Sequence, residues 1–173
     1  MRTFFCAAVA ALTSVVSANI HFSRTAKAIA PDSSFYVEFA DGCASTDDYG
    51  SNDCTFDWGQ AVEGSVTGKL GHDLQEGSSF HVNLKVDTVI PWKFSCAACG
   101  VNCTTTVPII NYPLEIPMPP CPVPAGDLQE ALSKALPAKS PTDGVKVTAK
   151  GSVGVKDEKG ADVLELNVDV TMK

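Results

Sequence analysis

Basic side chains are scarce in this chain of 173 residues. It has 13 lysines and arginines against 20 aspartates and glutamates, which gives a formal net charge of −7 at pH 7. A protein that binds nucleic acid normally carries an excess of basic residues, because many of its contacts are with phosphates. The composition therefore excludes nucleic acid as an expected partner.

Long apolar runs are also missing beyond the N-terminus. Residues 1–18, MRTFFCAAVAALTSVVSA, place one basic residue before an apolar run that ends in small residues, as a secretory signal peptide does. This run is shorter than the ~20 apolar residues that span a bilayer. We expect cleavage after Ala18 and a mature protein that is secreted or lies in the endolysosomal lumen.

Local catalytic signatures are absent as well. The three histidines, His21, His72 and His81, share no motif, and the chain contains no nucleophile elbow, zinc-protease motif or phosphate-binding glycine loop. This absence argues most strongly against a hydrolase. The sequence predicts a protein that is not an enzyme and that uses no cofactor.

Cysteine, in contrast, is plentiful, with seven residues in the chain. The stretch CAACGVNCTTT (96–106) could be a metal knuckle, a thioredoxin-like redox pair or part of a disulfide framework. A metal site would need a fourth ligand at short spacing, and a redox pair would need a helix where β-branched residues follow. Loss of Cys6 with the leader leaves an even number, which favours structural disulfides in a secreted protein.

Six cysteines allow 15 pairings, and the sequence does not choose among them. The local spacing gives hints, because two short loops are each flanked by cysteines that could close them. The suggested pairs are Cys43 with Cys54, Cys96 with Cys103, and, from the remainder, Cys99 with Cys121. Asn102-Cys103-Thr104 is also a sequon, so Asn102 is a candidate glycosylation site.

Alternation of apolar and polar residues is the dominant pattern. It is clearest over residues 80–87 and 164–173, and it recurs more briefly over residues 145–155. Each such run predicts a strand with one buried and one solvated face. Many short strands separated by turn residues indicate an all-β fold, an antiparallel β-sandwich stapled by disulfides.

Two segments depart from this pattern. Residues 108–124, PIINYPLEIPMPPCPVP, are apolar but dense in proline, which predicts an extended edge segment rather than a central strand. The segment DLQEALSKAL (127–136) begins with a possible capping box and has an apolar stripe at helical spacing. It therefore predicts one short amphipathic helix.

Two other features have competing interpretations. Asp47, Asp48 and Asp53 lie close together, but their spacing does not match a calcium-binding loop, so we interpret them as a solvated acidic loop and predict no metal site. Residues 90–118 carry many large apolar side chains in a stretch that should be edge or loop. These side chains could be ordinary core or the mouth of an apolar cavity between two sheets.

Four stretches together resemble a known family. They are VEGSVTGKLGHDLQEGSSFHVNLKVD, IPWKFSCAACGVNC, PPCPVPAGDL with its Cys-Pro-x-x-x-Gly element, and the final SPTDGVKVTAKGSVGVKDEKGADVLELNVDV. In order and spacing they are similar to the ML (MD-2-related lipid-recognition) domain, whose members include a lysosomal sterol carrier and the GM2 activator. The resemblance implies an immunoglobulin-like β-sandwich that holds a lipid between its sheets.

The sequence and the resemblance together leave three hypotheses for function. The first is a non-enzymatic lipid-binding or lipid-transfer protein for a sterol, phospholipid or glycolipid. In this hypothesis residues 1–18 are the leader, residues 19–34 an N-terminal segment and residues 35–173 the domain. The second is a protein-recognition module with a solid core. The third is an activator that presents lipid to a hydrolase and makes transient membrane contact through the predicted helix. The candidate cavity-lining residues are Val82, Leu84, Val86, Trp92, Phe94, Ile110, Tyr112, Ile116, Val147 and Val155.

Overall fold

Strands account for all the regular secondary structure of the described chain. The computed structural model describes residues 19–109 and 111–173, and within them it contains twelve strands and no helix. The predicted all-β class is confirmed. The strands are β1 (Asn19–Ile29), β2 (Ser34–Phe39), β3 (Cys43–Asp47), β4 (Gly50–Asp57), β5 (Ala61–Leu70), β6 (Ser79–Val86), β7 (Ile90–Ala97), β8 (Cys103–Val107), β9 (Tyr112–Ile116), β10 (Gly126–Ala135), β11 (Val147–Lys156) and β12 (Asp162–Met172).

The strands form one large sheet and one small one. The large sheet has the order β10-β5-β2-β4-β1-β12-β11-β6-β7, with β3 paired to β4 at its side, and β8 and β9 form a separate hairpin. Neighbouring strands are antiparallel except β2 and β4, which meet in parallel at the single pair Val37 and Gly50. The large sheet is thus held together weakly at this one point, and it can bend sharply there.

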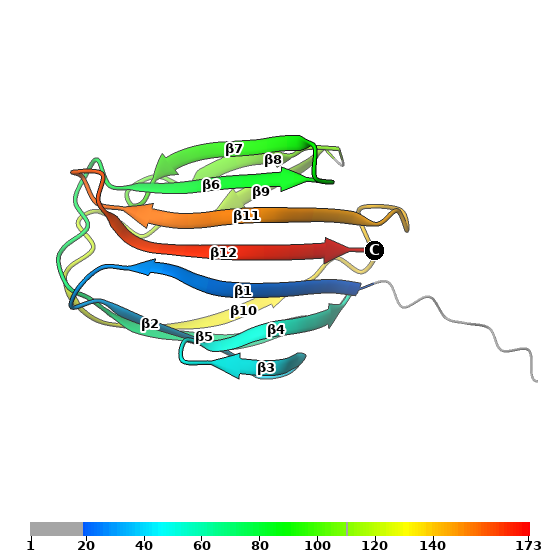
Figure 1. Ribbon diagram of the computed structural model, residues 1–173, viewed down its shortest axis with the longest axis horizontal. Helices are drawn as coiled ribbons and strands as arrows, with labels where there is room; N and C mark the ends of the chain where they lie inside the picture. Colours follow the sequence, from blue (N-terminus) through cyan, green and yellow to red (C-terminus); the bar gives the residue numbers. More distant parts are fainter. Residues whose placement is uncertain (1–18, 110) are drawn as a thin grey trace, which may run out of the picture.

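This bend gives the molecule two layers. In Figure 1, β4, β1, β12, β11, β6 and β7 follow one another from bottom to top, whereas β2, β5 and β10 are drawn behind β1 and β4. Side chains from β1 and β12 line the same cavity as side chains from β2, β5 and β10, so these two sets of strands face each other. The β8–β9 hairpin is drawn behind β6 and β7.

Every second side chain of the central strands is buried, and these side chains form the hydrophobic core. On β6, Val82, Leu84 and Val86 are buried and pack with Val147 and Ala149 of β11 in the first of two core clusters. A second cluster consists of Leu70, Leu74 and Val163. The intervening positions of β6 are exposed, as the period of two predicts for a sheet with one solvated face.

Three disulfides join the strands and loops in the pairs that the local spacing suggested. Cys43–Cys54 joins the paired strands β3 and β4, Cys96–Cys103 joins the end of β7 to the start of β8, and Cys99–Cys121 ties the β7–β8 loop to the segment after β9. Because disulfides form and persist in oxidising compartments, they indicate an extracellular or lumenal environment. The expected signal peptide, residues 1–18, lies outside the described residues.

The predicted helix at residues 127–136 is wrong. This segment is the edge strand β10, which pairs with β5 over ten residues from Gly126 to Ala135. Leu128 and Leu132 are four residues apart, and this spacing puts two side chains on one face in a helix and in a strand alike. The open edge of β5, with its row of unpaired backbone groups, decides in favour of the strand.

The N-terminal segment of the described chain lies within the sheet. Residues 19–29, set apart in the sequence analysis, form β1, which pairs with β12 on one side and with β4 on the other. A search of the described residues found no helix with the length and hydrophobicity needed to cross a membrane.

Candidate functional site

An apolar cavity lies between the two layers. Its volume is about 200 Å³, and its walls come from both layers of the sheet. The loop between β1 and β2 and the start of β12 close one end of it. The lining residues are Ile29, Ser33, Ser34, Phe35, Val37, Val66, Lys69, Leu70, Leu128, Val163, Leu164 and Leu166.

One glycine on β5 adds no side chain to this space. Val66 and Leu70 line the cavity, and Gly68 lies between them on the same face of the strand because side chains alternate. A Cβ atom at Gly68 would overlap the carbonyl oxygen of Ser34 on the neighbouring strand β2. Glycine is therefore required here for close strand approach, and it contributes no side chain to the interior.

Polar groups are few and lie at the rim. Ser33 uses its hydroxyl to accept a hydrogen bond from the backbone N–H of Gly71, at 3.0 Å, and Lys69 is exposed. The remaining lining side chains, apart from Ser34, are hydrocarbon or aromatic. An occupant would thus lose water over most of its surface without needing charged partners, which favours an apolar ligand.

The volume sets a limit on what fits without rearrangement. An engineered apolar cavity of about 150 Å³ holds benzene, whereas pockets for drug-sized ligands occupy roughly 300–1,000 Å³. At about 200 Å³ the cavity can take a short hydrocarbon segment. A complete sterol or a long acyl chain would require the two layers to move apart.

The residues predicted to line a cavity lie elsewhere. Val82, Leu84, Val86 and Val147 are close-packed in the first core cluster, and Trp92 and Phe94 of β7 pack against them. Val155 packs against the second cluster. Ile110 lies outside the described residues, Tyr112 is exposed and Ile116 is half-buried. Among the predicted residues that the structure describes, none belongs to the lining of the observed cavity.

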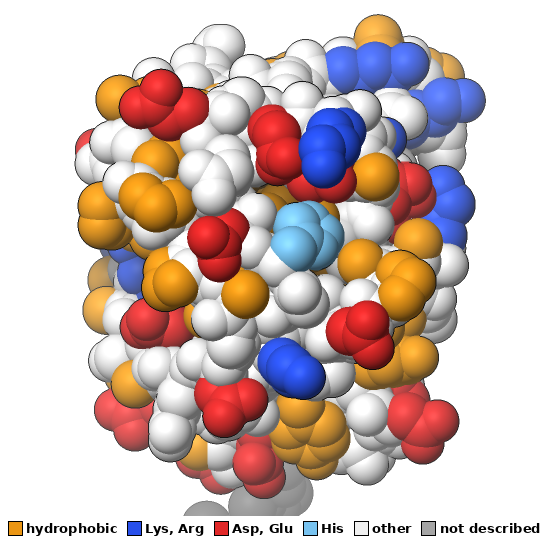
Figure 2. All heavy atoms as spheres, turned by 90° about the vertical axis from the view of Figure 1, so that its left-hand side faces the viewer, with side chains coloured by type: hydrophobic (Ala, Val, Ile, Leu, Met, Phe, Trp, Pro, Cys, Tyr) orange, Lys and Arg blue, Asp and Glu red, His pale blue; other side chains and the backbone are white. Residues whose placement is uncertain are grey.

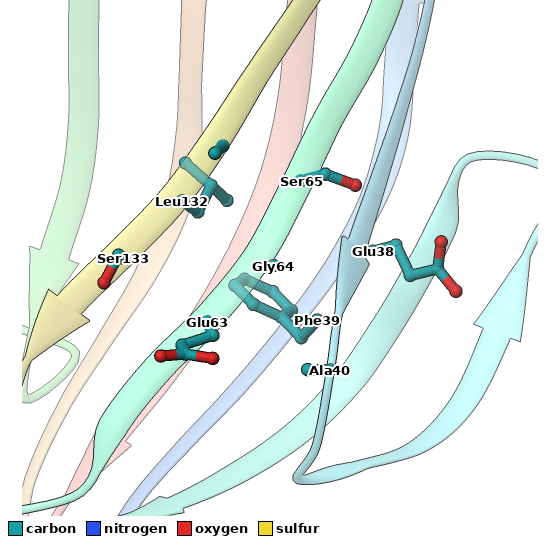
Figure 3. A pocket seen from close by; sticks show the side chains of 9 residues that line it. Glu38, Phe39, Ala40, Glu63, Gly64, Ser65, Leu132 and Ser133 are labelled. Carbon is teal, nitrogen blue, oxygen red and sulfur yellow. The ribbon is translucent and has the colours of Figure 1, made fainter.

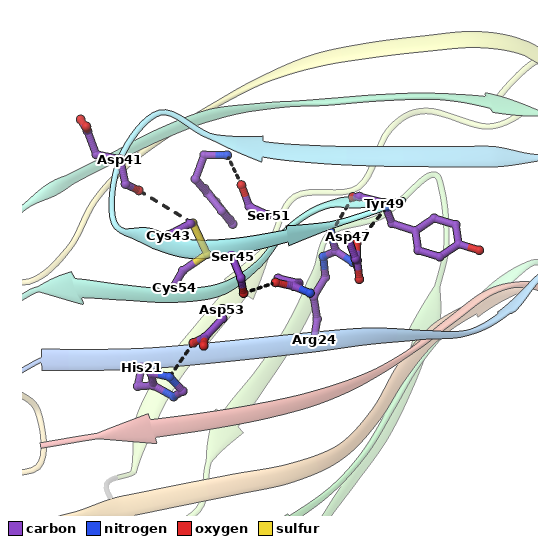
Figure 4. The surroundings of a disulfide bond; sticks show 12 residues. His21, Arg24, Asp41, Cys43, Ser45, Asp47, Tyr49, Ser51, Asp53 and Cys54 are labelled. Atoms are coloured by element: carbon purple, nitrogen blue, oxygen red, sulfur yellow. Dashed lines mark hydrogen bonds and ion pairs between the residues drawn. A yellow bond between two sulfur atoms is a disulfide. The ribbon is translucent and has the colours of Figure 1, made fainter.

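A buried ion pair lies close to the cavity and was missed in the sequence. Arg24 of β1 is 3% exposed, and its guanidinium donates to Asp47 at 3.2 and 3.4 Å and to the carbonyl oxygen of Tyr49 at 2.6 Å. It also lies over the ring of Phe35, at 5.6 Å from the ring centre, and Phe35 lines the cavity. Figure 4 shows Arg24 and Asp47 directed toward each other near the Cys43–Cys54 disulfide.

The charge state of Asp47 follows from these contacts. Partial burial raises the pKa of its carboxyl, but the hydrogen bond from the Tyr49 backbone N–H and the charge of Arg24 outweigh burial, so the pKa lies below its ordinary value. Asp47 therefore stays ionised and paired. A missed signal was the single arginine in the otherwise alternating run IHFSRTAKAI at residues 20–29.

A wider depression lies further along β2, β5 and β10, toward residues 40, 61 and 133. It encloses about 520 Å³ and is lined by polar residues as well as Phe39 and Leu132. Figure 3 shows the carboxylates of Glu38 and Glu63 pointing away from each other at this depression. Because it is open to solvent and flanked by two carboxylates, it would gain little from an apolar ligand and offers no paired acid and base.

Two of the three histidines each contact one carboxylate. His21 contacts Asp53 at 2.8 Å, and His72 lies 3.8 Å from Asp157, so each histidine has one carboxylate neighbour. Of the acidic loop residues, Asp47 is paired with Arg24 and Asp53 contacts His21, so their carboxylates do not point at a common site. Within residues 19–109 and 111–173, no group of three or more histidine, cysteine, aspartate or glutamate side chains could hold a metal ion.

The candidate glycosylation site is on the surface. Asn102 is exposed in the loop between β7 and β8, where its amide donates to Glu115 at 2.8 Å and its side-chain oxygen accepts from the backbone of Met118 at 3.3 Å. Thr104 of the sequon is exposed as well, whereas Cys103 is buried in a disulfide. The asparagine is thus accessible in the folded chain.

Comparisons of this sequence with protein-family models and with curated proteins gave no match.

Proposed function

We propose that this protein is a non-enzymatic lipid-binding protein that holds an apolar ligand between two layers of an immunoglobulin-like β-sandwich. The observation that supports the proposal most directly is the cavity between β1 and β12 on one side and β2, β5 and β10 on the other. Its walls are almost wholly hydrocarbon, and its few polar groups lie at the rim. The resemblance to the ML domain supports the same function and fold.

Burial of hydrocarbon supplies the binding energy. Each buried methylene contributes about 0.8 kcal/mol, so a chain segment of a few carbons already gives measurable affinity before ordering costs. In this proposal the cavity accepts the end of a lipid tail first, and the layers separate around the rest. The candidate ligands are a sterol, a phospholipid or a glycolipid, taken up in a secreted or endolysosomal compartment.

The layers can separate at the weakest point of the sheet. A single register pair, Val37 and Gly50, and a hydrogen bond from the Phe39 N–H to the Ser51 hydroxyl join β2 to β4 among the described residues, whereas β1 and β12 pair over most of their length. Movement of β2, β5 and β10 as a unit would break few backbone hydrogen bonds. This arrangement favours a lipid-binding protein over a recognition module with a solid interior, which would need no such cavity.

The experiment is native mass spectrometry of the secreted, disulfide-intact protein, with organic extraction and identification of any bound lipid. We expect a discrete adduct of sterol or acyl lipid, or loading of the protein from vesicles that contain these lipids. A protein that carries no lipid and takes none from such vesicles would contradict the proposal and favour the recognition module.

A matched pair of variants tests the cavity itself. Leu128→Trp puts a large side chain into the cavity, whereas Leu132→Trp makes the same change four residues further along β10, where the residue lines the open depression instead. We expect the first variant to lose the lipid adduct and the second to keep it, both with native circular dichroism. Equal retention by both folded variants would place the ligand elsewhere.

A further inference from the structure

Three loops carry exposed hydrophobic side chains to the same end of the molecule. They are the β6–β7 turn, the tip of the β8–β9 hairpin and the loop before β11. In Figure 1 this is the right-hand end, where β6 ends and β7 and β11 begin. We call the five exposed hydrophobic residues in and next to these loops the apolar rim: Val89, Ile90, Ile109, Tyr112 and Val145.

Hydrogen bonds and strand direction fix this arrangement. The β6–β7 turn is joined to the start of β11 by Asp87, whose backbone N–H donates to the carbonyl oxygen of Thr148 at 2.8 Å and whose carboxylate accepts from the N–H of Thr148 at 2.8 Å. The Cys96–Cys103 disulfide connects the far end of β7 to the start of β8. Strand β8 therefore runs back toward the β6–β7 turn, and its hairpin tip lies at the same end.

The rim residues are unusually exposed for their type. Val89 is 75% exposed and Val145 is 63% exposed, although buried valine is the norm in a folded domain. Tyr112 adds an amphipathic ring, a side chain that is common where an apolar layer meets water. The opposite end, which Figure 2 shows, instead mixes hydrophobic side chains with acidic, basic and other polar ones.

The backbone of these loops adopts conformations that are unfavourable for residues other than glycine. Among the described residues, six non-glycine positions have a positive φ, and five of them lie in the three loops: Asp87, Thr88, Ile109, Asn111 and Asp143. Thr88 and Ile109 are β-branched, so for them this conformation is strained, and such strain tends to occur at functional positions. The turns present their apolar side chains outward at a conformational cost that a merely connecting loop would avoid.

Three lysines lie within a few residues of the rim, although the protein as a whole is acidic. Lys85, Lys93 and Lys146 are exposed beside it, and none of them forms an ion pair with another described residue. The facing acidic groups are Asp87, which is engaged with Thr148, and the exposed Asp143. The local balance is thus positive, whereas the chain carries a net charge of −7.

We propose that the apolar rim docks on a lipid bilayer whose surface carries anionic lipid. Separate apolar tips on three turns suit a bilayer, which needs no matching shape, better than a protein partner, which does. Lysines placed around inserted apolar side chains add attraction to anionic headgroups. This inference goes beyond ligand binding in the cavity and holds whatever the cavity contains.

The test is flotation of the intact protein with vesicles of phosphatidylcholine alone and with added phosphatidylserine. We expect binding to both kinds of vesicle, tighter with phosphatidylserine and weaker as salt rises, because salt screens surface charges. The variant Val89→Asp/Val145→Asp should weaken partitioning at least about tenfold, since two apolar side chains would be replaced by anionic ones. Because both sites are exposed, the fold should be unaffected.

Val101→Asp is the matched control. Val101 is 66% exposed, but it lies in the β7–β8 loop at the opposite end of the molecule, so this variant should bind vesicles as well as the native protein does. A second variant, Lys85→Gln/Lys93→Gln/Lys146→Gln, should lose only the preference for phosphatidylserine. Equal losses in the Val101 and rim variants would overturn the proposal.

Two other outcomes would also overturn it. The first is a native protein that binds neither kind of vesicle. The second is a dimer in solution that the Val89→Asp/Val145→Asp variant abolishes, because the rim would then be an interface between two copies. Failure of the cavity proposal is a different result: the protein would then dock on vesicles yet show no lipid adduct by native mass spectrometry.

Discussion

Arg24 and Asp47 form an ion pair in the interior, where β1 passes the end of β3 and the sheet bends between β2 and β4. The guanidinium nitrogen and the carboxylate oxygen are 3.2 Å apart, and the arginine side chain is almost fully buried while the aspartate is partly exposed. A buried charge is costly unless it is paired and hydrogen-bonded. This pair therefore fixes how the turn between β3 and β4 sits against β1.

Removal of one partner should be much more harmful than removal of both. We expect Asp47→Ala to lower the free energy of unfolding by about 3 kcal/mol, because it leaves the Arg24 guanidinium buried without its counter-ion. The double variant Arg24→Met/Asp47→Ala should recover much of this loss, since methionine fills the site without a charge. Urea unfolding of the four forms measures the coupling, and additive effects of the two substitutions would contradict it.

Acid should destabilise the protein through three carboxyl groups. The pKa values of Asp162 and Glu165 lie below their ordinary ranges because of hydrogen bonds from Lys156 and Lys27, and the pKa of Asp47 is lowered as well. A carboxyl whose pKa is lower in the folded state stabilises it fully above the unfolded-state value and loses that effect as pH falls through the folded-state value.

The stability should therefore be steady near neutral pH and fall below about pH 4, the ordinary range of carboxyl groups. The urea midpoint measured from pH 7 to pH 2 tests this expectation. Lys27→Met removes the partner of Glu165 and should make the acid-dependent loss smaller. A midpoint that stays constant down to pH 2 would show that these carboxyl groups have the same pKa in both states.

Glycine at position 50 should be indispensable. Its φ is +93°, and a Cβ atom there would overlap the carbonyl oxygen of Val37, its only partner across the β2–β4 junction. Gly144 has a φ of +82°, but no atom lies within 4 Å of where its Cβ would be. Gly144→Ala should lower the free energy of unfolding only by the cost of holding alanine in the left-handed backbone region, about 1–2 kcal/mol.

Gly50→Ala should lower the free energy of unfolding clearly more than Gly144→Ala does, because β2 and β4 must also shift apart. Thermal unfolding of the two variants compares them directly. If the two variants have the same midpoint, β2 and β4 are not in close contact at this point.

The sequence predicted well what depends on local pattern. The alternation over residues 80–87 and 164–173 corresponds to β6 and β12, because one face of each strand packs in the interior. The disulfide pairs followed from short spacing, since cysteines that flank a small loop are held close by the chain itself. In these cases the residues that determine the structure are neighbours in sequence.

The failures arise where distant segments decide. The segment 127–136 has a pattern compatible with helix and strand, and only the open edge of β5 selects the strand. The cavity is formed by five strands that contribute one to three side chains each, so no single stretch of sequence reveals it. Arg24 was overlooked because its partner comes from β3, 23 residues along the chain.

Leu84 distinguishes the core from the cavity, which the sequence did not separate. It is 5% exposed in the cluster of β6 and β11 and is not among the cavity-lining residues. Leu84→Ala should lower the free energy of unfolding by about 2–5 kcal/mol, because it leaves a void in a close-packed cluster. The folded fraction of this variant should nevertheless keep its lipid adduct in native mass spectrometry. Loss of the adduct from folded Leu84→Ala, with retention in Leu128→Trp, would move the binding site to the cluster that the alternation pattern first suggested.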